Sequence, residues 1–152
     1  MSYSAAGGRQ QLLDTIAAAT DRIGVALAAL GLAYEQLDEH HGDELEAALF
    51  RPVQAAYGRA RRTYTEFAAR YDLPARTFAP GSAGLASAGT RSLIEDAVDA
   101  AEEADETIAT LQDSLLPIEV GDREVRAGLS AVRELLAPVP GRAREVVRTI
   151  GR

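Results

Sequence analysis

The stretch that decides the fold is IGVALAALGLAY, residues 23–34, which runs for twelve residues without a polar interruption. Large side chains recur through it and beyond it at alternating spacings of four and three residues: Ile23, Leu27, Leu30, Tyr34 and Leu37. This spacing is typical of the contact line along which packed helices meet. It predicts one long helix from about residue 10 to residue 38.

The face of this helix opposite the contact line is also apolar. Val25 and Leu32 lie there one heptad apart, with the small residue Ala28 between them. A helix that is apolar all round is expected to be buried all round. Twelve residues are too few to span a bilayer, which requires about 20. Two alternatives stay open: a later crossover segment covers this face, or a second copy of the chain does.

A second helix is predicted over residues 43–71, with Asp43 as its N-cap after a break at residues 40–42. Its inward positions are Leu45, Leu49, Val53, Ala56, Ala60, Tyr64 and Phe67. Pro52 lies inside this segment, where it removes a backbone hydrogen bond and clashes with the preceding turn. We expect a kink there, or a short helix followed by a longer one.

Residues 72–88 contain prolines and glycines at positions 74, 80, 81 and 84 and are predicted to form a crossover. A third helix is predicted from Thr90 or Ser92, where Ser92 and Glu95 would form a capping box. Its inner face is Ile94, Val98, Ala101, Ile108, Leu111 and Leu115, and Pro117 closes it. A fourth helix begins near residue 122 with Val125, Leu129, Val132 and Leu136 on its inner face. Prolines 138 and 140 separate it from a short basic helix over residues 142–150.

These segments predict an all-α fold in a single domain, residues 1–152. Two long helical hairpins, joined by the crossover at 72–88, would form a four-helix bundle with coiled-coil-like packing and a short C-terminal helix. No alternating run of β-branched residues is long enough to indicate a strand. Residues 1–9 are expected to be a flexible N-terminus.

The composition excludes several classes of function. The chain has no cysteine, which removes disulfides, thiolate metal sites and cysteine nucleophiles. All 16 basic residues are arginine, so lysine Schiff-base chemistry is absent as well. A net charge of −7 disfavours binding to nucleic acid or to anionic membranes. The lysine-free, alanine-rich composition indicates a GC-rich, bacterial genome, and the absence of a secretory signal in residues 1–10 predicts a cytoplasmic protein.

Acidic residues crowd the start of the third helix. Asp99, Glu102, Glu103 and Glu106 share one helical face and could hold a hard cation. Di-metal bundles, however, draw ligands from several helices and use Glu-x-x-His pairs, which this chain lacks. A solvated face paired with arginines of the second helix, namely Arg59, Arg62 and Arg70, is the simpler interpretation.

Asp105 differs from these acids because it falls on the inner side of the third helix. A buried carboxylate requires a partner, and Arg126 or Arg133 of the fourth helix is the expected one. His40 and His41 stand in an acidic segment, but adjacent histidines in a helix point about 100° apart. Both could therefore bind one ion only in a loop. The candidates for a metal site are Glu102, Asp105 and His40, and the sequence favours none of them.

The chain contains no catalytic constellation, and no cofactor is implied. The sequence favours a non-enzyme: a protein–protein interaction or self-association module. We expect a homodimer whose interface contains Val25, Ala28 and Leu32, and a different protein partner stays open. The alternative is a bundle that binds a small ligand or a metal at an acidic site between helices.

Overall fold

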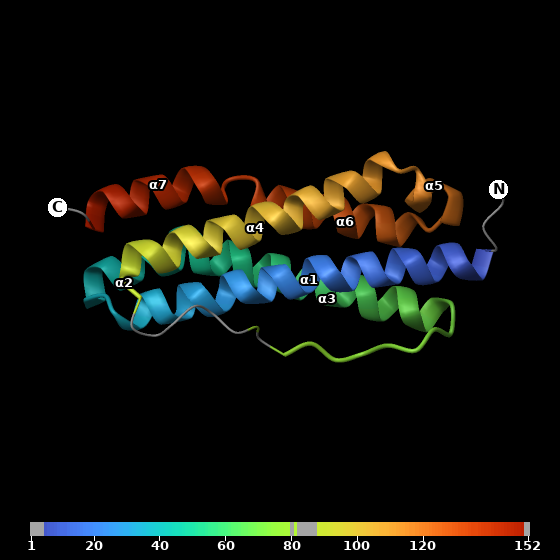
Figure 1. The fold of residues 1–152 in the computed structure, drawn as a ribbon, viewed down its shortest axis with the longest axis horizontal. Coiled ribbons are helices and arrows are strands. Elements are labelled where there is room, and N and C mark those ends of the chain that lie inside the picture. The colour runs from blue at the N-terminus through green and yellow to red at the C-terminus, as the bar shows by residue number, and fades with distance from the viewer. Residues whose placement is uncertain (1–4, 80, 82–87, 151–152) are drawn as a thin grey trace.

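The computed structural model describes residues 5–79, 81 and 88–150, and its regular elements are all helical (Figure 1). The predicted all-α class is therefore confirmed, with no strand in the described ranges. The elements are α1 (Ala5–Glu35), α2 (Glu39–Leu45), the π-helical turn η1 (Glu46–Phe50), α3 (Arg51–Arg70), α4 (Thr90–Asp113), α5 (Leu116–Val120), α6 (Arg123–Leu136) and α7 (Val139–Ile150).

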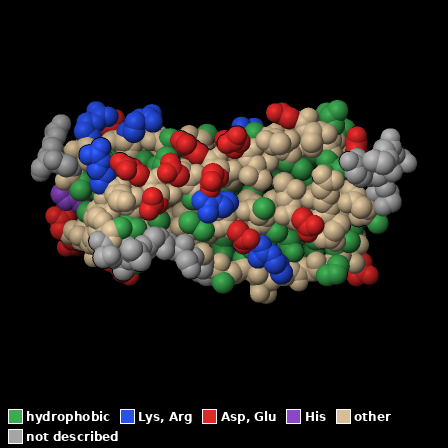
Figure 2. Space-filling model, in the orientation of Figure 1, with side chains coloured by type: hydrophobic (Ala, Val, Ile, Leu, Met, Phe, Trp, Pro, Cys, Tyr) green, Lys and Arg blue, Asp and Glu red, His purple; other side chains and the backbone are tan. Residues whose placement is uncertain are grey.

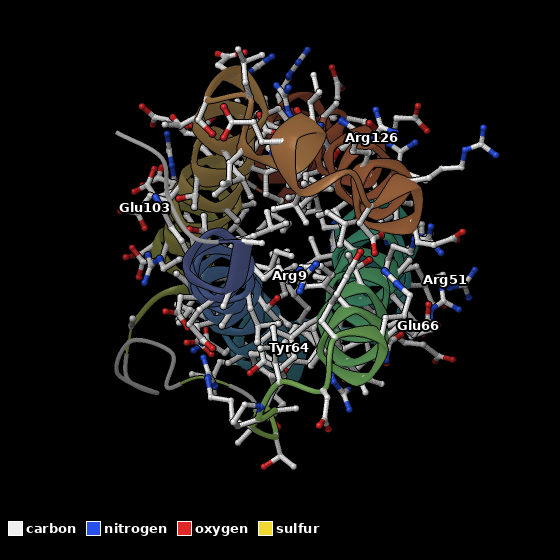
Figure 3. All side chains as sticks on the ribbon, turned by 90° about the vertical axis from the view of Figure 1, so that its right-hand side faces the viewer. Arg9, Arg51, Tyr64, Glu66, Glu103 and Arg126 are labelled. Atoms are coloured by element: carbon white, nitrogen blue, oxygen red, sulfur yellow. The ribbon has the colours of Figure 1, made fainter. Side chains whose placement is uncertain are left out.

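The long helices lie side by side along the longest axis of the molecule (Figure 1). α1 packs against both α4 and α3, α6 packs against α3, and α7 packs against α4 and η1. Their inward side chains form one continuous core, visible between the helices in the end-on view of Figure 3. Among the most completely buried of these side chains are Phe67, Leu12, Leu30, Leu93, Ile94 and Leu129.

The first two segments differ from the prediction at their ends. α1 already begins at Ala5, so residues 5–9 are helical rather than flexible. The break after α1 lies at residues 36–38, and Asp38, not Asp43, is the N-cap of α2. The Asp38 side chain accepts a hydrogen bond from the His41 backbone N–H at 2.8 Å, which satisfies one free donor of the first turn. Gly42 does not break the helix; it provides room for the Tyr34 ring, which lies 3.2 Å from where a Cβ would stand.

Pro52 is accommodated by a widened helical turn. It occupies the first turn of α3, directly after the π-helical residues Glu46–Phe50. A proline has no N–H to donate, and its ring clashes with the carbonyl four residues earlier in regular α-helix. A π-turn relieves that clash by lengthening the hydrogen-bonded ring. The chain therefore continues from α2 into α3 without a loop.

The turn that follows α4 corrects two predictions. Leu115 was expected on the inner face, but it adopts a left-handed backbone with φ 66° and is 56% exposed. The helix has already ended at Asp113, so Leu116 and Pro117 are buried instead and begin α5. The expected capping box is also absent: α4 starts at Thr90, with Gly89 as an N-cap that has no side-chain hydrogen bond. Ser92 stands inside the first turn, too late to cap it.

The described part of the crossover, residues 71–79 and 81, runs back along α3 and α1 (Figure 1). Tyr64 anchors its first part: its hydroxyl accepts from the Arg76 backbone N–H at 3.1 Å, and its ring packs edge-to-face on Phe78. Farther along, Gly81 lies directly against Val25 of α1. Pro80 and Gly84, two of the residues on which the crossover was predicted, lie outside the described residues.

Candidate functional site

The outer face of α1 is partly covered. Val25, Ala28 and Leu32 are each neither buried nor fully exposed. A Cβ on Gly81 would stand 2.8 Å from Val25 Cγ2, so the crossover covers the Val25 end of this face. By length and composition alone, α1 is also apolar enough to cross a membrane, a property that buried core helices share, and 56% of its most apolar window is buried. The outer face of α1 is thus apolar and covered only in part.

A small pocket adjoins this face at the C-terminal end of α1. Gly31, Tyr34 and Glu35 contribute one wall, and Glu46 and Phe50 of η1 contribute the other. Its volume is about 430 Å³. The π-helical turn that accommodates Pro52 is what places Glu46 and Phe50 opposite α1.

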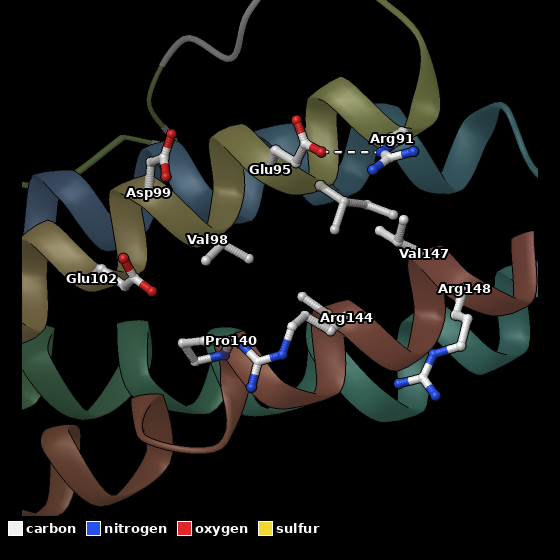
Figure 4. Close-up of a pocket in the computed structure, with 11 residues that line it drawn as sticks. Arg91, Glu95, Val98, Asp99, Glu102, Pro140, Arg144, Val147 and Arg148 are labelled. Carbon is white, nitrogen blue, oxygen red and sulfur yellow. Dashed lines mark hydrogen bonds and ion pairs between the residues drawn. The ribbon is translucent and has the colours of Figure 1, made fainter. Parts of the chain in front are cut away.

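A larger groove of about 590 Å³ separates α4 from α7 (Figure 4). Its floor is apolar and consists of Ile94, Val98, Ala143 and Val147. Its rims are charged: Arg91, Glu95, Asp99 and Glu102 on α4, and Arg144 and Arg148 on α7. Two of the rim arginines form ion pairs within their own helix, Arg91 with Glu95 and Arg148 with Glu145. The groove therefore offers both signs of charge above an apolar floor.

The acidic face of α4 is exposed, as Figure 2 shows by the cluster of acidic side chains over that helix. The sequence predicted that arginines of α3 would pair with this acidic face, and that prediction is wrong. The helices that flank α4 are α1 and α7. Glu103 instead forms an ion pair with Arg22 of α1. Arg70, one of the expected partners, is engaged elsewhere.

Asp105 is paired with Arg133, one of its two candidate partners. Arg133 Nε donates to Asp105 Oδ1 at 2.9 Å, and Arg133 Nη1 donates to Gln112 Oε1 at 3.0 Å. Arg126 is exposed on the surface of α6 (Figure 3). The Asp105 and Arg133 side chains are 35% and 41% exposed, so the pair lies at the edge of the core rather than inside it.

Replacing Asp105 with alanine is therefore expected to have a small effect. Partly solvated ion pairs contribute about 1 kcal/mol or less, which corresponds to a shift of roughly 2–4 °C in melting temperature for a domain of this size. Asp99→Ala on the same helix, where no ion pair is lost, is the matched control. Thermal melts followed by circular dichroism measure both. A loss above about 3 kcal/mol would instead show a fully desolvated pair.

The three metal candidates are not brought together. Glu102 lines the α4–α7 groove, Asp105 faces Arg133, and His40 lies on α2 with Nε2 3.8 Å from Glu44 Oε1. In residues 5–79, 81 and 88–150, no three His, Asp or Glu side chains are grouped closely enough to hold a metal ion.

His40 and His41 are on a helix, not in a loop. Their ring centroids are 5.4 Å apart with the planes at 64°. His41 Nδ1 lies 2.8 Å from Asp38 Oδ1, so each imidazole faces a different carboxylate. The backbone hydrogen bond from His41 lowers the pKa of Asp38 below its usual value. This arrangement caps α2 and does not converge on one ion.

The most completely buried carboxylate is one whose pairing the sequence did not reveal. Asp122 has a side chain only 4% exposed and forms a two-pronged pair with Arg70: Nε to Oδ2 at 2.8 Å and Nη2 to Oδ1 at 2.7 Å. Asp122 Oδ1 also accepts from the Val125 backbone N–H at 2.8 Å, as the N-cap of α6. The only sequence signal was an aspartate at a helix start; its partner stands 52 residues earlier.

The rest of this cluster closes the end of the molecule. Tyr71 also hydrogen-bonds to Asp122, and the Arg9 guanidinium lies 4.3 Å from the Tyr71 ring centre. Burial and the hydrogen bond to Asp122 raise the pKa of Tyr71. Burial also acts to raise the pKa of Asp122, but hydrogen bonds from Arg70, Val125 and Tyr71 outweigh it and hold that pKa below its usual value. Asp122 and Arg70 match each other's charge, and Arg9 lies over the Tyr71 ring, an arrangement that suits a structural clamp.

No protein-family model matches this chain, and no match is found among curated proteins or solved structures.

Proposed function

We propose that this chain is a non-catalytic interaction module that associates with a second copy of itself. In this proposal the chain is a four-helix bundle. Its four helices are α1, the continuous α2–α3 segment, α4 and the interrupted α6–α7 segment. The observation that carries it is the outer face of α1, where an apolar helix is covered only in part.

Several features of that face suit a helix from another subunit. Gly81 contacts its Val25 end, while Ala28 and Leu32 continue it toward the open pocket above Gly31. Small residues let a second helix approach closely, and a two-fold dimer uses one patch twice. Apolar surface that remains open favours a protein partner. The net charge of −7 disfavours nucleic acid and anionic membranes as partners.

Leu32→Glu tests this proposal. In a dimer, the buried glutamates would repel one another and lose hydration, so the mass from light scattering should halve while helicity stays unchanged. Val147→Glu, which places the same charge in the α4–α7 groove, is the matched control and should leave the dimer intact. If Val147→Glu dissociates the dimer and Leu32→Glu does not, the interface lies in the groove. A wild type that is monomeric at high micromolar concentration would reject the homodimer.

A second candidate function is binding of a small ligand in the α4–α7 groove. Glu102 and Arg144 both line that groove, and the groove volume of about 590 Å³ is within the range of roughly 300–1,000 Å³ that ligand sites occupy. Rims of both charges suit a zwitterion, and Glu102 could contribute to a bound cation. Elemental analysis of the purified protein tests the cation: stoichiometric metal that is lost in Glu102→Gln would favour this alternative.

A further inference from the structure

Tyr34 and Phe50 stand apart from the other aromatic residues. In the described part of the chain, they are the Tyr and Phe rings that contact neither another ring nor a guanidinium group. The other rings there are engaged as follows: Tyr57 with Arg61, Tyr64 with Phe78, Phe78 also with Arg76, and Tyr71 with Phe67 and Arg9. The two unengaged rings line the same pocket, at the end of α1.

The charges of this pocket are uncompensated. Glu35 and Glu46 line it with the two rings, and no arginine or histidine does. Among the ion pairs and side-chain hydrogen bonds of residues 5–79, 81 and 88–150, neither carboxylate takes part. Aromatic faces and free carboxylates both attract cations. The missing component of this pocket is a positive charge.

Gly31 keeps the α1 wall of the pocket open. A glycine in a helix interior costs about 1 kcal/mol relative to alanine. No described atom lies within 4 Å of the position a Gly31 Cβ would take, so no contact among residues 5–79, 81 and 88–150 requires glycine there. Gly24, one heptad earlier, differs because Tyr57 lies 3.2 Å from its Cβ position.

We propose that this pocket binds the guanidinium group of an arginine that a partner protein presents. The inference rests on the proposed interaction function and adds the chemistry that the partner must bring. A guanidinium is planar, stacks on aromatic rings and donates in a fork to carboxylates, so it matches this combination of two rings and two acids better than a lysine ammonium does.

The chain already uses this pairing internally. Arg9 stands 4.3 Å from the Tyr71 ring centre, and Arg76 stands 4.3 Å from that of Phe78. Arg76 also bonds to the carboxylate of Asp21, so one guanidinium there serves a ring and an acid together. The pocket at Tyr34 and Phe50 has the same two components without the arginine. Because the chain contains no lysine, a second copy would supply an arginine rather than a lysine.

The test is a titration of ¹⁵N-labelled protein with N-acetyl-arginine amide, in which the chemical shifts of the backbone amides report binding. N-acetyl-citrulline amide is the matched probe, because it has nearly the same shape without the charge. The titration uses the monomeric species, selected by dilution and checked by light scattering, so that no subunit contact hides the pocket. We expect saturable shifts at residues 31–35 and 46–50, with citrulline amide binding at least about tenfold more weakly.

Two glycine variants separate the pocket from the fold. Gly31→Ala places a methyl group on the α1 wall of the pocket and should weaken arginine-amide binding by about tenfold while leaving helicity unchanged. Gly58→Ala, at another helical glycine with nothing within 4 Å of its Cβ position, should leave binding unaltered. Glu46→Gln should weaken binding by removing one of the two charges, and it does so without adding volume.

Three results would overturn the inference: no saturable shifts at the pocket, equal binding of citrulline amide, or unaltered binding in both Gly31→Ala and Glu46→Gln. The result is separable from the proposed self-association. A monomeric wild type that shows the pocket shifts would reject the homodimer and keep the arginine site. A wild type that dimerises but shows no pocket shifts as a monomer would keep the homodimer and reject the arginine site.

Discussion

Gly128→Ala is expected to lower the free energy of unfolding by about 2 kcal/mol, although alanine favours helix over glycine by about 1 kcal/mol. Gly128 lies on α6 where it crosses α3. An added Cβ would stand 2.2 Å from Thr63 Oγ1, 2.7 Å from Thr63 Cγ2 and 3.0 Å from Thr63 Cβ. Thr63 cannot turn aside easily, because its hydroxyl donates to the Arg59 carbonyl at 2.8 Å. The two helices would have to separate.

Urea unfolding measures this effect, and two controls sharpen it. Gly58→Ala, a helical glycine with an open Cβ position, should raise stability by about 1 kcal/mol. Thr63→Ala removes the two closest atoms. The double variant Thr63→Ala/Gly128→Ala should therefore lose less free energy of unfolding than the two single variants lose together. A Gly128→Ala protein as stable as wild type would show that α3 and α6 have room to spare.

Asp122→Asn is expected to cost about 3 kcal/mol, near the lower end for breaking a buried ion pair. Asparagine keeps the shape and the capping oxygen for Val125, but it removes the charge that faces Arg70. Because the Arg70 side chain is 32% exposed, water can partly compensate it, which moderates the loss. Asp122→Ala also removes the cap and should cost about 1 kcal/mol more.

The pH dependence of this difference gives a separate check. The pKa of Asp122 is lowered in the folded state, whereas an unfolded aspartate titrates near 3.9. The stabilisation is therefore complete above about pH 5, declines as the pH falls below the unfolded pKa, and is lost once the pH has passed through the folded pKa. Melting temperatures of wild type and Asp122→Asn should differ at pH 7 and converge in stronger acid. A difference that stays constant to about pH 2 would show that the charge of Asp122 contributes nothing.

The helices themselves could be read from local pattern. The alternating spacing from Ile23 to Leu37 identified α1, and the spacing from Val125 to Leu136 identified α6. Pro52 indicated an irregular turn, and the structure has one in η1. Helical periodicity depends on neighbours three and four residues apart, which the sequence shows directly.

Helix ends were less predictable, because several residues compete to cap a helix. Asp38 and Asp43 both suit an N-cap; Asp38 caps α2, and the helix runs on through Gly42, over which Tyr34 packs. Leu115 has the right spacing for the inner face of α4, yet α4 ends before it and leaves it exposed. Such choices are decided by packing between segments.

The sequence by itself determined the helical class, the main helical segments and the apolar excess on α1, because these follow from residue type and short-range spacing. It also narrowed the partner of Asp105 to two arginines on the facing helix. Only the tertiary structure decided that Arg70 pairs with Asp122, that Gly81 covers Val25, and that Phe50 and Tyr34 line one pocket with Gly31. These contacts join segments far apart in the chain, and their geometry depends on how the helices pack around one shared core.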